Sequence, residues 1–278
     1  MKNTVVILLT VLPLCAQQPA EPPAVLRIFR EEIKEGKAAA HQKTEAAFMQ
    51  AAEGAKYPAH ILGLTNITGT SLAVFLEGHP TFASIADSQA ALDTPEFGKL
   101  DSADGELRIN QRSILAAYRG DLSYAADKIN LPKVRFVSIE TIRVREGQGQ
   151  KYVELARVLV RAAEKSSDNQ PVATYQVTSG APDGTFLLLE PMESLKSLDE
   201  EPKRVQALIQ ADRNGPQTVR EYYETFASNE SILFAVDPMM SYVPKEWVAA
   251  SPDFWGRKPA APVSKAPSTK PAAKHVAK

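Results

Sequence analysis

The sequence predicts an α+β fold made of two consecutive β-α-β-β-α-β units, whose four-stranded antiparallel sheets pack face to face and close into a barrel. An internal repeat is the first observation behind this expectation. The segment SILAAYRGDLSY at residues 113–124 returns as SILFAVDPMMSY at residues 231–242, with the same residue at six positions. A repeat of this kind reveals a duplicated architecture before any single helix or strand is assigned.

Two further sets of segments repeat at nearly the same spacing. Residues 33–36 (IKEG) correspond to residues 144–147 (VREG), an offset of 111. Four more matched positions follow at an offset of 113: Glu77 with Glu190, Phe82 with Leu195, Ser84 with Ser197, and Ile85 with Leu198. The offset grows steadily along the chain, which is the pattern expected when one unit is duplicated and its loops then lengthen.

The first unit, placed at residues 25–130, shows the elements in order. Residues 25–33 predict a strand that ends at a Lys-Glu-Gly turn, and the alanine-rich stretch 37–53, which lacks glycine and proline, predicts a helix. A hairpin around Thr68-Gly69 follows. Its second strand contains SLAVFL, an apolar run typical of strands covered on both faces. The last elements expected are a helix at 80–92, a polar connection to about residue 112, and the SILAAYR strand.

The second unit, placed at residues 131–255, repeats this order. Residues 148–165 predict an amphipathic helix, because Tyr152, Leu155 and Leu159 fall on one stripe. The other expected elements are strands at 134–144, 172–178, 185–190 and 231–236, and helical stretches at 192–198, 204–211 and 217–227. Each unit thus has the split β-α-β order called ferredoxin-like. Its helices cover one face of the sheet, so the other face needs the partner sheet as its cover.

The stretches TIRVREGQGQKYVELARVLVRAAEK and ATYQVTSGAPDGTFLLLEPMESLKSL carry a family resemblance. They resemble the dimeric α+β barrel superfamily, with its NIPSNAP-like and antibiotic-biosynthesis-monooxygenase-like members, here as a tandem duplication. The resemblance implies the fold. It implies little about activity, because that superfamily includes small cofactor-free oxygenases, haem enzymes and proteins without known activity, and one fold hosts many functions.

Composition excludes one large class of partners. The formal net charge of the chain is −1, but residues 3–256 carry 25 basic and 33 acidic residues, a net charge of −8. Nucleic acid binding needs a basic face for the phosphates, so the sequence predicts no nucleic-acid partner. The sequence also contains no phosphate-binding glycine loop, no H-E-x-x-H and no C-x-x-C, which disfavours nucleotide hydrolysis, zinc-protease chemistry and thiol redox chemistry.

Both ends of the chain have distinctive composition. Residues 1–17 read as a signal peptide, with Lys2, an apolar run and Pro13 before LCAQ, so we expect a secreted or periplasmic protein without a transmembrane segment in its mature chain. Cleavage after Ala16 or Gln17 removes the only cysteine, Cys15; the alternative is lipidation at Cys15. Residues 18–24 form a disordered lead-in, and residues 256–278 a disordered basic tail that either stays solvated or contacts an anionic envelope surface.

Histidines supply the first candidate site residues. His41 and Glu45 lie four residues apart on the first helix and so share a face, where they could bind a metal or haem or act as a base. One such pair lacks the third and fourth ligands of a metal site, so the sequence predicts no metal and no cofactor. His60 opens a strand, and His79 lies in a turn; neither has a partner nearby in sequence.

Aromatic residues supply the others. Tyr124 and Tyr242 occupy the same place in the two units, and Tyr175 lies in the middle of a strand. Aromatic rings that line a barrel can stack on a flat ligand, although packing explains them equally well. Arg119 is a candidate for stabilising an oxyanion, or else a solvated strand-end residue. The predicted ligand-binding set is therefore His41, His60, Arg119, Tyr124, Tyr175 and Tyr242, with no catalytic residue.

Apolar strands, the export signal and the missing catalytic motifs favour an exported, non-enzymatic protein that binds a small apolar or aromatic ligand or a partner. Two alternatives remain. One is a cofactor-free monooxygenase or isomerase, in which His60, Tyr175 and Arg119 position a small aromatic substrate. The other is a haem protein with His41 or His79 as axial ligand.

Overall fold

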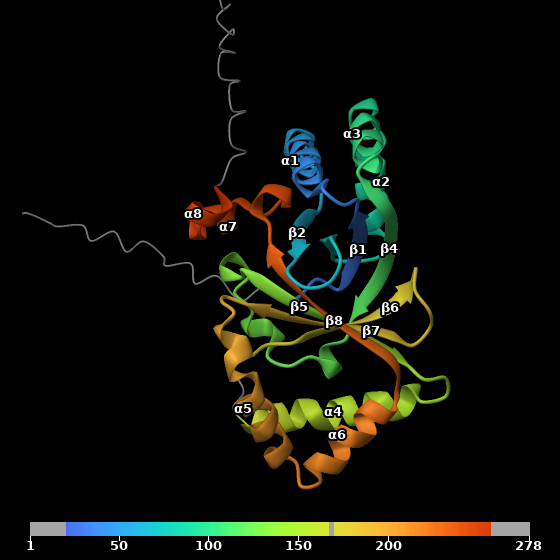
Figure 1. Ribbon diagram of the computed structural model, residues 1–278, viewed down its shortest axis with the longest axis vertical. Helices are drawn as coiled ribbons and strands as arrows, with labels where there is room; N and C mark the ends of the chain where they lie inside the picture. The colour runs from blue at the N-terminus through green and yellow to red at the C-terminus, as the bar shows by residue number, and fades with distance from the viewer. Residues whose placement is uncertain (1–20, 167–169, 257–278) are drawn as a thin grey trace, which may run out of the picture.

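Eight antiparallel strands close into one barrel in the order β1-β3-β2-β8-β5-β7-β6-β4. The structure is a computed structural model that describes residues 21–166 and 170–256. Figure 1 shows the helices in two groups on opposite sides of the barrel, with α1, α2 and α3 over one side and α4, α5 and α6 under the other. The expected α+β barrel is confirmed.

The first half of the chain contributes four strands and three helices. In order they are β1 (Val25–Ile33), α1 (Ala38–Gly54), β2 (His60–Asn66), β3 (Leu72–His79), α2 (Ser84–Leu92), α3 (Pro95–Gly105) and β4 (Arg108–Tyr118). Three short 3₁₀ turns lead to the second half: η1 (Gly120–Leu122), η2 (Ala126–Lys128) and η3 (Leu131–Lys133).

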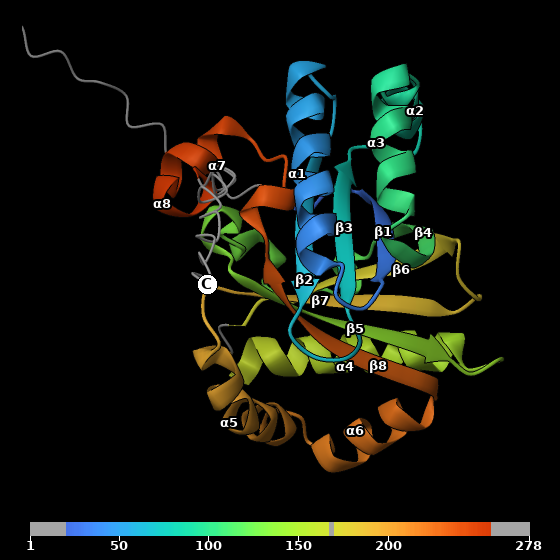
Figure 2. The ribbon, with the colours of Figure 1, turned by 45° about the horizontal axis from the view of Figure 1, so that its top comes forward.

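The second half repeats this order and ends in a short helical segment. Its elements are β5 (Phe136–Val144), α4 (Gly149–Ser166), β6 (Ala173–Ser179), β7 (Thr185–Met192), α5 (Lys196–Ala211), α6 (Gly215–Glu224) and β8 (Phe226–Val236). The 3₁₀ turn η4 (Pro238–Met240) and helices α7 (Lys245–Ala250) and α8 (Pro252–Trp255) follow. In Figure 2, α7 and α8 lie beside the barrel, away from α2 and α3.

The structure differs from the sequence-based expectation in three ways. The polar connection after residue 92 contains α3, whose start is marked by Thr94: its side chain accepts a hydrogen bond from the backbone N–H of Phe97, and Pro95 follows it. Strands β4 and β8 each begin about five residues earlier than predicted, because their polar first halves pair with β1 and β5. Helices α7 and α8 were not expected.

Two seams join the four strands of one half to those of the other. Strand β2 pairs with β8 over three residue pairs, from Leu64 with Val236 to Asn66 with Phe234. Strand β4 pairs with β6 from Leu115 with Ser179 to Tyr118 with Tyr175. Within each half the strands lie in the order fourth-first-third-second, β4-β1-β3-β2 and β8-β5-β7-β6.

Strand alternation divides the side chains between two environments. On β1, Leu26 and Ile28 belong to the apolar core inside the barrel, whereas Arg27, Phe29 and Glu31 point outward toward the helices. The same alternation on β3 sends Val74 and Leu76 inward and Phe75 and Glu77 outward. As the sequence indicated, Leu72 to Leu76 are all buried, because both faces of this strand are covered.

Loops and the C-terminal segment cover one end of the barrel. The indole N–H of Trp255 donates to the carbonyl of Pro132 at 2.9 Å, and the Tyr175 hydroxyl donates to the carbonyl of Pro23 at 3.0 Å. Residues 21–24, which belong to the predicted lead-in, therefore lie against the barrel end; Ala24 also accepts from the backbone N–H of Tyr118 at 2.9 Å.

The expected signal peptide (1–17) and most of the expected basic tail (256–278) lie outside the described residues. Within the described ranges, no helix combines the length and the apolar character needed to span a membrane.

The contact between β2 and η4 generates a stability prediction. A Cβ atom on Gly63 would collide with the backbone carbonyl of Met240, which is fully buried. We expect Gly63→Ala to lower the free energy of unfolding by about 1–3 kcal/mol, as other overpacked substitutions do. Gly98→Ala is the matched control, because Gly98 is an exposed residue of α3 and an added Cβ would have nothing within 4 Å. This substitution should raise the free energy of unfolding by less than about 1 kcal/mol. Urea unfolding of both variants checks this, and equal stabilities would contradict it.

Candidate ligand-binding site

A pocket of about 490 Å³ opens at the covered end of the barrel. Barrel-interior side chains form its floor, among them Leu26, Leu62 and Leu76, and the C-terminal segment adds Val243 and Trp247 to its wall. The lining is predominantly apolar, with few polar side chains at its edge. Small-molecule sites in proteins usually combine these features. We refer to this site as the barrel-end pocket.

Tyr175 reaches the barrel-end pocket from β6. It shares the inward face of that strand with Ala173 and Val177, and it is 2% exposed. Its ring lies 5.4 Å from that of Tyr118, and its hydroxyl donates to the carbonyl of Pro23. Burial raises the pKa of Tyr175. The phenol is therefore neutral and held in place, a polar group at the boundary of an apolar pocket.

His60 stands on the opposite side of the same pocket, at the start of β2. Its ring lies 5.3 Å from the ring of Tyr242, whose backbone pairs with Ile61. Partial burial lowers the pKa of His60 below its ordinary value of 6.5, so the imidazole is neutral at pH 7. A neutral imidazole can accept a proton or donate a hydrogen bond, which suits a polar contact with a bound ligand.

The remaining predicted site residues lie elsewhere. Arg119 forms an ion pair with Asp121 at 2.8 Å and donates to Gln176 at 2.6 Å; its hydrogen bond lowers the pKa of the Asp121 carboxyl. Tyr124 pairs with Val172 through its backbone and lines a separate cavity of about 240 Å³ beneath α4 and α5. His60 and Tyr175 thus line the same pocket, and Tyr242 lies beside His60. The pocket lining does not include His41, Arg119 or Tyr124.

Behind the barrel-end pocket lies a buried polar network formed by Arg27, Tyr57, Glu77 and His79, here called the Glu77 network. Arg27 and Glu77 are directly opposite on β1 and β3, and the guanidinium donates to both carboxylate oxygens at 2.8–3.0 Å. The Tyr57 hydroxyl donates to Glu77 Oε1 at 2.9 Å, and His79 Nε2 lies 2.7 Å from the same oxygen. All of these groups are buried.

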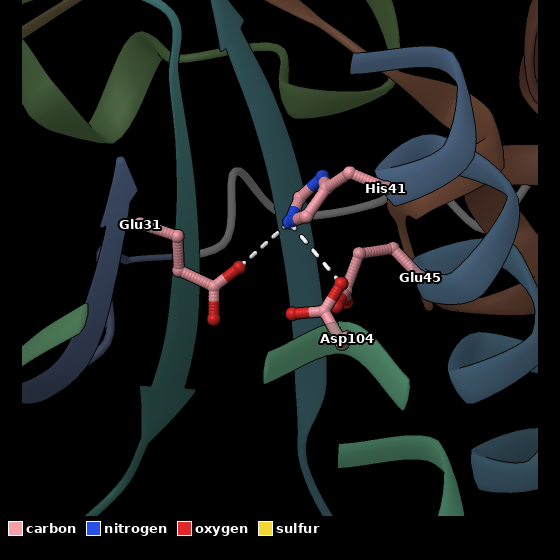
Figure 3. A group of neighbouring side chains, drawn as sticks. All are labelled: Glu31, His41, Glu45 and Asp104. Carbon is pink, nitrogen blue, oxygen red and sulfur yellow. Dashed lines mark hydrogen bonds and ion pairs between the residues drawn. The ribbon is translucent and has the colours of Figure 1, made fainter. Parts of the chain in front are cut away.

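A second buried cluster, here called the His41 cluster, contains Glu31, His41, Glu45 and Asp104 (Figure 3). Arg108, which pairs with Glu31 and Asp104, completes it. Glu31 comes from β1, His41 and Glu45 from one face of α1, Asp104 from the end of α3, and Arg108 from the start of β4. His41 Nε2 lies 2.8 Å from Glu31 Oε2 and 3.6 Å from Asp104 Oδ1. The cluster borders a cavity of about 340 Å³ between the helices and the outer face of the sheet.

Burial of several carboxylates together changes their acidity. Burial, followed by repulsion from Glu31 and Asp104, raises the pKa of Glu45 well above 4.5. Burial is also the largest cause that raises the pKa of Asp104, to about 6, although the neighbouring His41 lowers it. Such carboxylates are uncommon in a purely structural setting and mark candidate functional positions.

Sequence reasoning missed Arg27, Glu31, Glu77, Asp104 and Arg108. One signal for the first three was present, since outward-facing strand residues of a helix-covered sheet are buried. Charged residues at such positions need partners, and a search for those partners would have connected Glu31 to His41. Asp104 lay in a stretch without a predicted helix, so no signal linked it to the cluster.

Comparisons with known proteins identify the class of fold. The sequence matches no family model and no curated protein. Among solved structures, a candidate monooxygenase from Fusobacterium nucleatum superposes with a TM-score of 0.56 at 10% identity, covering 77% of this chain and 93% of its own. A candidate monooxygenase from Lactobacillus acidophilus gives 0.52 at 9% identity, with 78% and 94% covered. An anthrone oxidase-like protein gives 0.54 at 13% identity, with 76% and 90% covered.

The chain has the fold of these solved structures. At sequence identities of 9–13%, this similarity supports a shared fold and not a shared function. The α+β barrel fold that the sequence resemblance implied is confirmed.

The Glu77 network generates a second prediction. Glu77→Gln leaves the buried Arg27 guanidinium without a carboxylate, and we expect it to lower the free energy of unfolding by about 3–5 kcal/mol. Glu230→Gln is the same substitution in the exposed Arg30–Glu230 pair, and it should change stability by no more than about 1 kcal/mol. Urea denaturation of both variants measures the contrast; a Glu77→Gln variant as stable as Glu230→Gln would show that the buried network contributes little.

Proposed function

We propose that the protein binds a small apolar or aromatic ligand in the barrel-end pocket. The observation that carries this proposal is a 490 Å³ pocket lined mostly by apolar side chains, with His60 and Tyr175 as polar groups at its wall. The volume falls in the range typical of small-molecule sites. Trp247, Leu62 and Leu76 supply apolar contact, and the neutral imidazole of His60 supplies a hydrogen-bonding group for one polar atom of the ligand.

Tyr175 shapes the pocket in this proposal and does not bind the ligand's polar atom. Its hydroxyl already donates to the Pro23 carbonyl, which ties the chain at residues 21–24 to the pocket rim. Its ring, tilted by 56° against that of Tyr118, presents an aromatic surface at the barrel interior. The ligand therefore meets a ring face on one side and an imidazole on the other, an arrangement that favours a flat molecule.

A cofactor-free monooxygenase or isomerase is the second candidate. It is supported by the fold neighbours, two of which are candidate monooxygenases and one an anthrone oxidase-like protein. His60 would serve as the base in such chemistry, because its lowered pKa keeps it neutral near pH 7. Arg119, paired with Asp121 and outside the pocket lining, would not contact the substrate in this arrangement.

Haem binding receives less support from the geometry. His41 Nε2 faces Glu31, and His79 Nε2 faces Glu77, each within 2.8 Å of a carboxylate oxygen. His79 Nδ1 also lies 3.4 Å from the hydroxyl of Ser84. A haem iron bound to either nitrogen would replace the contact of that histidine with a buried carboxylate.

Three finer parts of the proposal rest on sequence. We propose that the two halves are tandem ferredoxin-like units, at about 25–130 and 131–255, that arose by duplication and resemble NIPSNAP-like proteins. We also propose that the chain is exported to the periplasm or beyond, on the signal-like composition of residues 1–17. The basic composition of the tail supports a contact with an anionic envelope surface.

Filling the barrel-end pocket tests its role. Val243 is half-buried at the pocket wall, so Val243→Trp should occupy pocket volume and weaken binding of the fluorescent probe 1-anilinonaphthalene-8-sulfonate at least about tenfold, the loss of roughly 1.4 kcal/mol of contact. Val205→Trp, the same substitution at an exposed position of α5 outside this pocket, should bind the probe like the unmodified protein. Equal affinities of both variants for the probe would show that the probe binds outside the barrel-end pocket.

Small-molecule mass spectrometry of the purified protein then separates the two candidate functions. A ligand recovered unchanged after incubation in air supports a binding protein. A recovered ligand that is converted to an oxygenated or isomerised product, with conversion lost in His60→Gln, supports the enzyme.

A further inference from the structure

The two halves of the barrel place different chemistry at equivalent positions. Equivalence follows from matched backbone contacts: the N–H of His41 donates to the carbonyl of Lys37, and that of Tyr152 donates to Gln148. Ile33 pairs with Arg108 after a register shift, and Val144 pairs with Phe226 after the same shift. The backbone N–H of Leu107 donates to the backbone carbonyl of Asp104, and that of Thr225 donates to the backbone carbonyl of Tyr222. The His41 cluster therefore has a complete counterpart in the second half.

That counterpart is apolar and aromatic. Ile142, Tyr152, Ala156, Tyr222 and Phe226 occupy the positions of Glu31, His41, Glu45, Asp104 and Arg108, respectively. The rings of Tyr152 and Tyr222 stack with centroids 5.3 Å apart, and Tyr222 and Phe226 meet edge to face at 4.9 Å. The fold thus packs this location without charges. Since buried ion clusters are often no more stable than apolar packing of similar volume, the charges in the first half call for a role other than packing.

The charges in the His41 cluster are not balanced. Glu31, Glu45 and Asp104 are three carboxylates, each at most 8% exposed, against the single guanidinium of Arg108. Arg108 lies 2.7 Å from Glu31 Oε1 and 2.9 Å from Asp104 Oδ2, so it forms ion pairs with two of the three carboxylates. The side chain of Glu45 forms no hydrogen bond or ion pair with any residue in 21–166 or 170–256, although Glu45 is 8% exposed and its carboxylate points into the cluster (Figure 3).

The partners of Glu31 and Asp104 leave one oxygen of each directed at the same point. Glu31 Oε1 accepts from Arg108 at 2.7 Å and from Gln111 at 3.0 Å, while Oε2 faces His41. Asp104 Oδ2 faces Arg108, while Oδ1 faces His41. In metal sites, too, outer partners occupy one oxygen of a carboxylate and orient the other toward the ion.

We propose that Glu31, His41, Glu45 and Asp104 bind one divalent transition-metal ion. One donor atom from each of the four lies within 4.8 Å of all the others. Donors bound to one ion at 2.0–2.2 Å lie about 3–4 Å apart, so small side-chain shifts complete the site. When all three carboxylates are ionised, as metal ligands are, they and Arg108 carry a net charge of −2, which the two positive charges of the ion offset.

One imidazole and three carboxylates define the class of ion. Imidazole is a ligand for Zn²⁺ and Fe²⁺, and carboxylates suit Mn²⁺ as well; the absence of a thiolate or thioether among these four side chains disfavours Cu⁺. The cavity of about 340 Å³ that Glu31, Glu45 and Asp104 line gives the ion a path from solvent. It also leaves room for water or a small ligand to complete the coordination of the ion.

Metal titration of the whole protein tests the proposal. The chelator-treated protein is titrated calorimetrically with ZnCl₂ and, separately, with MnCl₂, and the bound metal is counted by mass spectrometry. We expect one equivalent per chain, with Zn²⁺ bound more tightly than Mn²⁺ in accordance with the general order of divalent-ion affinities. Less than about one-fifth of an equivalent of either ion, at concentrations that saturate ordinary protein sites, would overturn the proposal.

Matched variants locate the ion. Glu45→Gln removes a ligand charge but no existing partner, and we expect it to weaken Zn²⁺ binding by at least about tenfold, the lower end of what disturbing an outer partner of a metal costs. Glu53→Gln, an exposed position on the same helix, should leave the affinity unchanged. If Glu45→Gln binds one equivalent as tightly as Glu53→Gln, the ion lies elsewhere and the assignment fails.

A direct measurement covers the case in which Glu45→Gln does not fold. The X-ray absorption spectrum of the Zn²⁺-loaded, unmodified protein should show oxygen donors and a single imidazole. A spectrum with no imidazole, or with more than one, contradicts the proposed ligand set. Because the barrel-end pocket contributes no ligand to this site, its probe binding should be the same with and without metal.

Discussion

Closure of the barrel is the constraint on which the rest of the structure depends. The β2–β8 and β4–β6 seams join two four-stranded sheets so that each has one face turned inward and one face under helices. Every strand of the barrel has a partner strand on each side, although β4 meets β6 and β8 meets β2 only over their last residues. In return, every inward side chain has to fit a narrow apolar interior, and polar chemistry is confined to the barrel ends and to the layers beneath the helices.

This confinement explains where the two candidate sites lie. The barrel-end pocket forms where strands end and where residues 21–24, η3 and α7 cover the opening, so apolar and polar groups meet there. The His41 cluster forms beneath α1 and α3, on the outer face of the sheet. The sites share no ligand-contacting residue. The Glu77 network lies between them, since His79 lines the pocket and Glu77 lines the cavity beside the cluster.

The two halves of the barrel share their order of elements but differ in the side chains at equivalent positions. Equivalent positions carry Glu31 and His41 in one half and Ile142 and Tyr152 in the other, yet the flanking turns keep the same geometry: Gly36 and Gly147 both adopt positive φ, at 70° and 76°. Strand pairing fixes the order of the elements in the barrel. The side chains beneath the helices need only fill the space between the helices and the sheet. One half is therefore free to hold a polar site while the other half packs aromatic rings.

The sequence by itself determined the fold class and most of the strands, because apolar periodicity and the internal repeat can be recognised without knowledge of the three-dimensional structure. It also placed His60 and Tyr175 on strands whose inward faces meet, which is why both line one pocket. Only the tertiary structure decided that Glu31 and Asp104 join His41 and Glu45. These residues come from β1, α3 and α1, and their encounter depends on how the helices pack on the sheet. That packing angle is set by side-chain contacts distributed over the whole layer, so no single stretch of sequence encodes it.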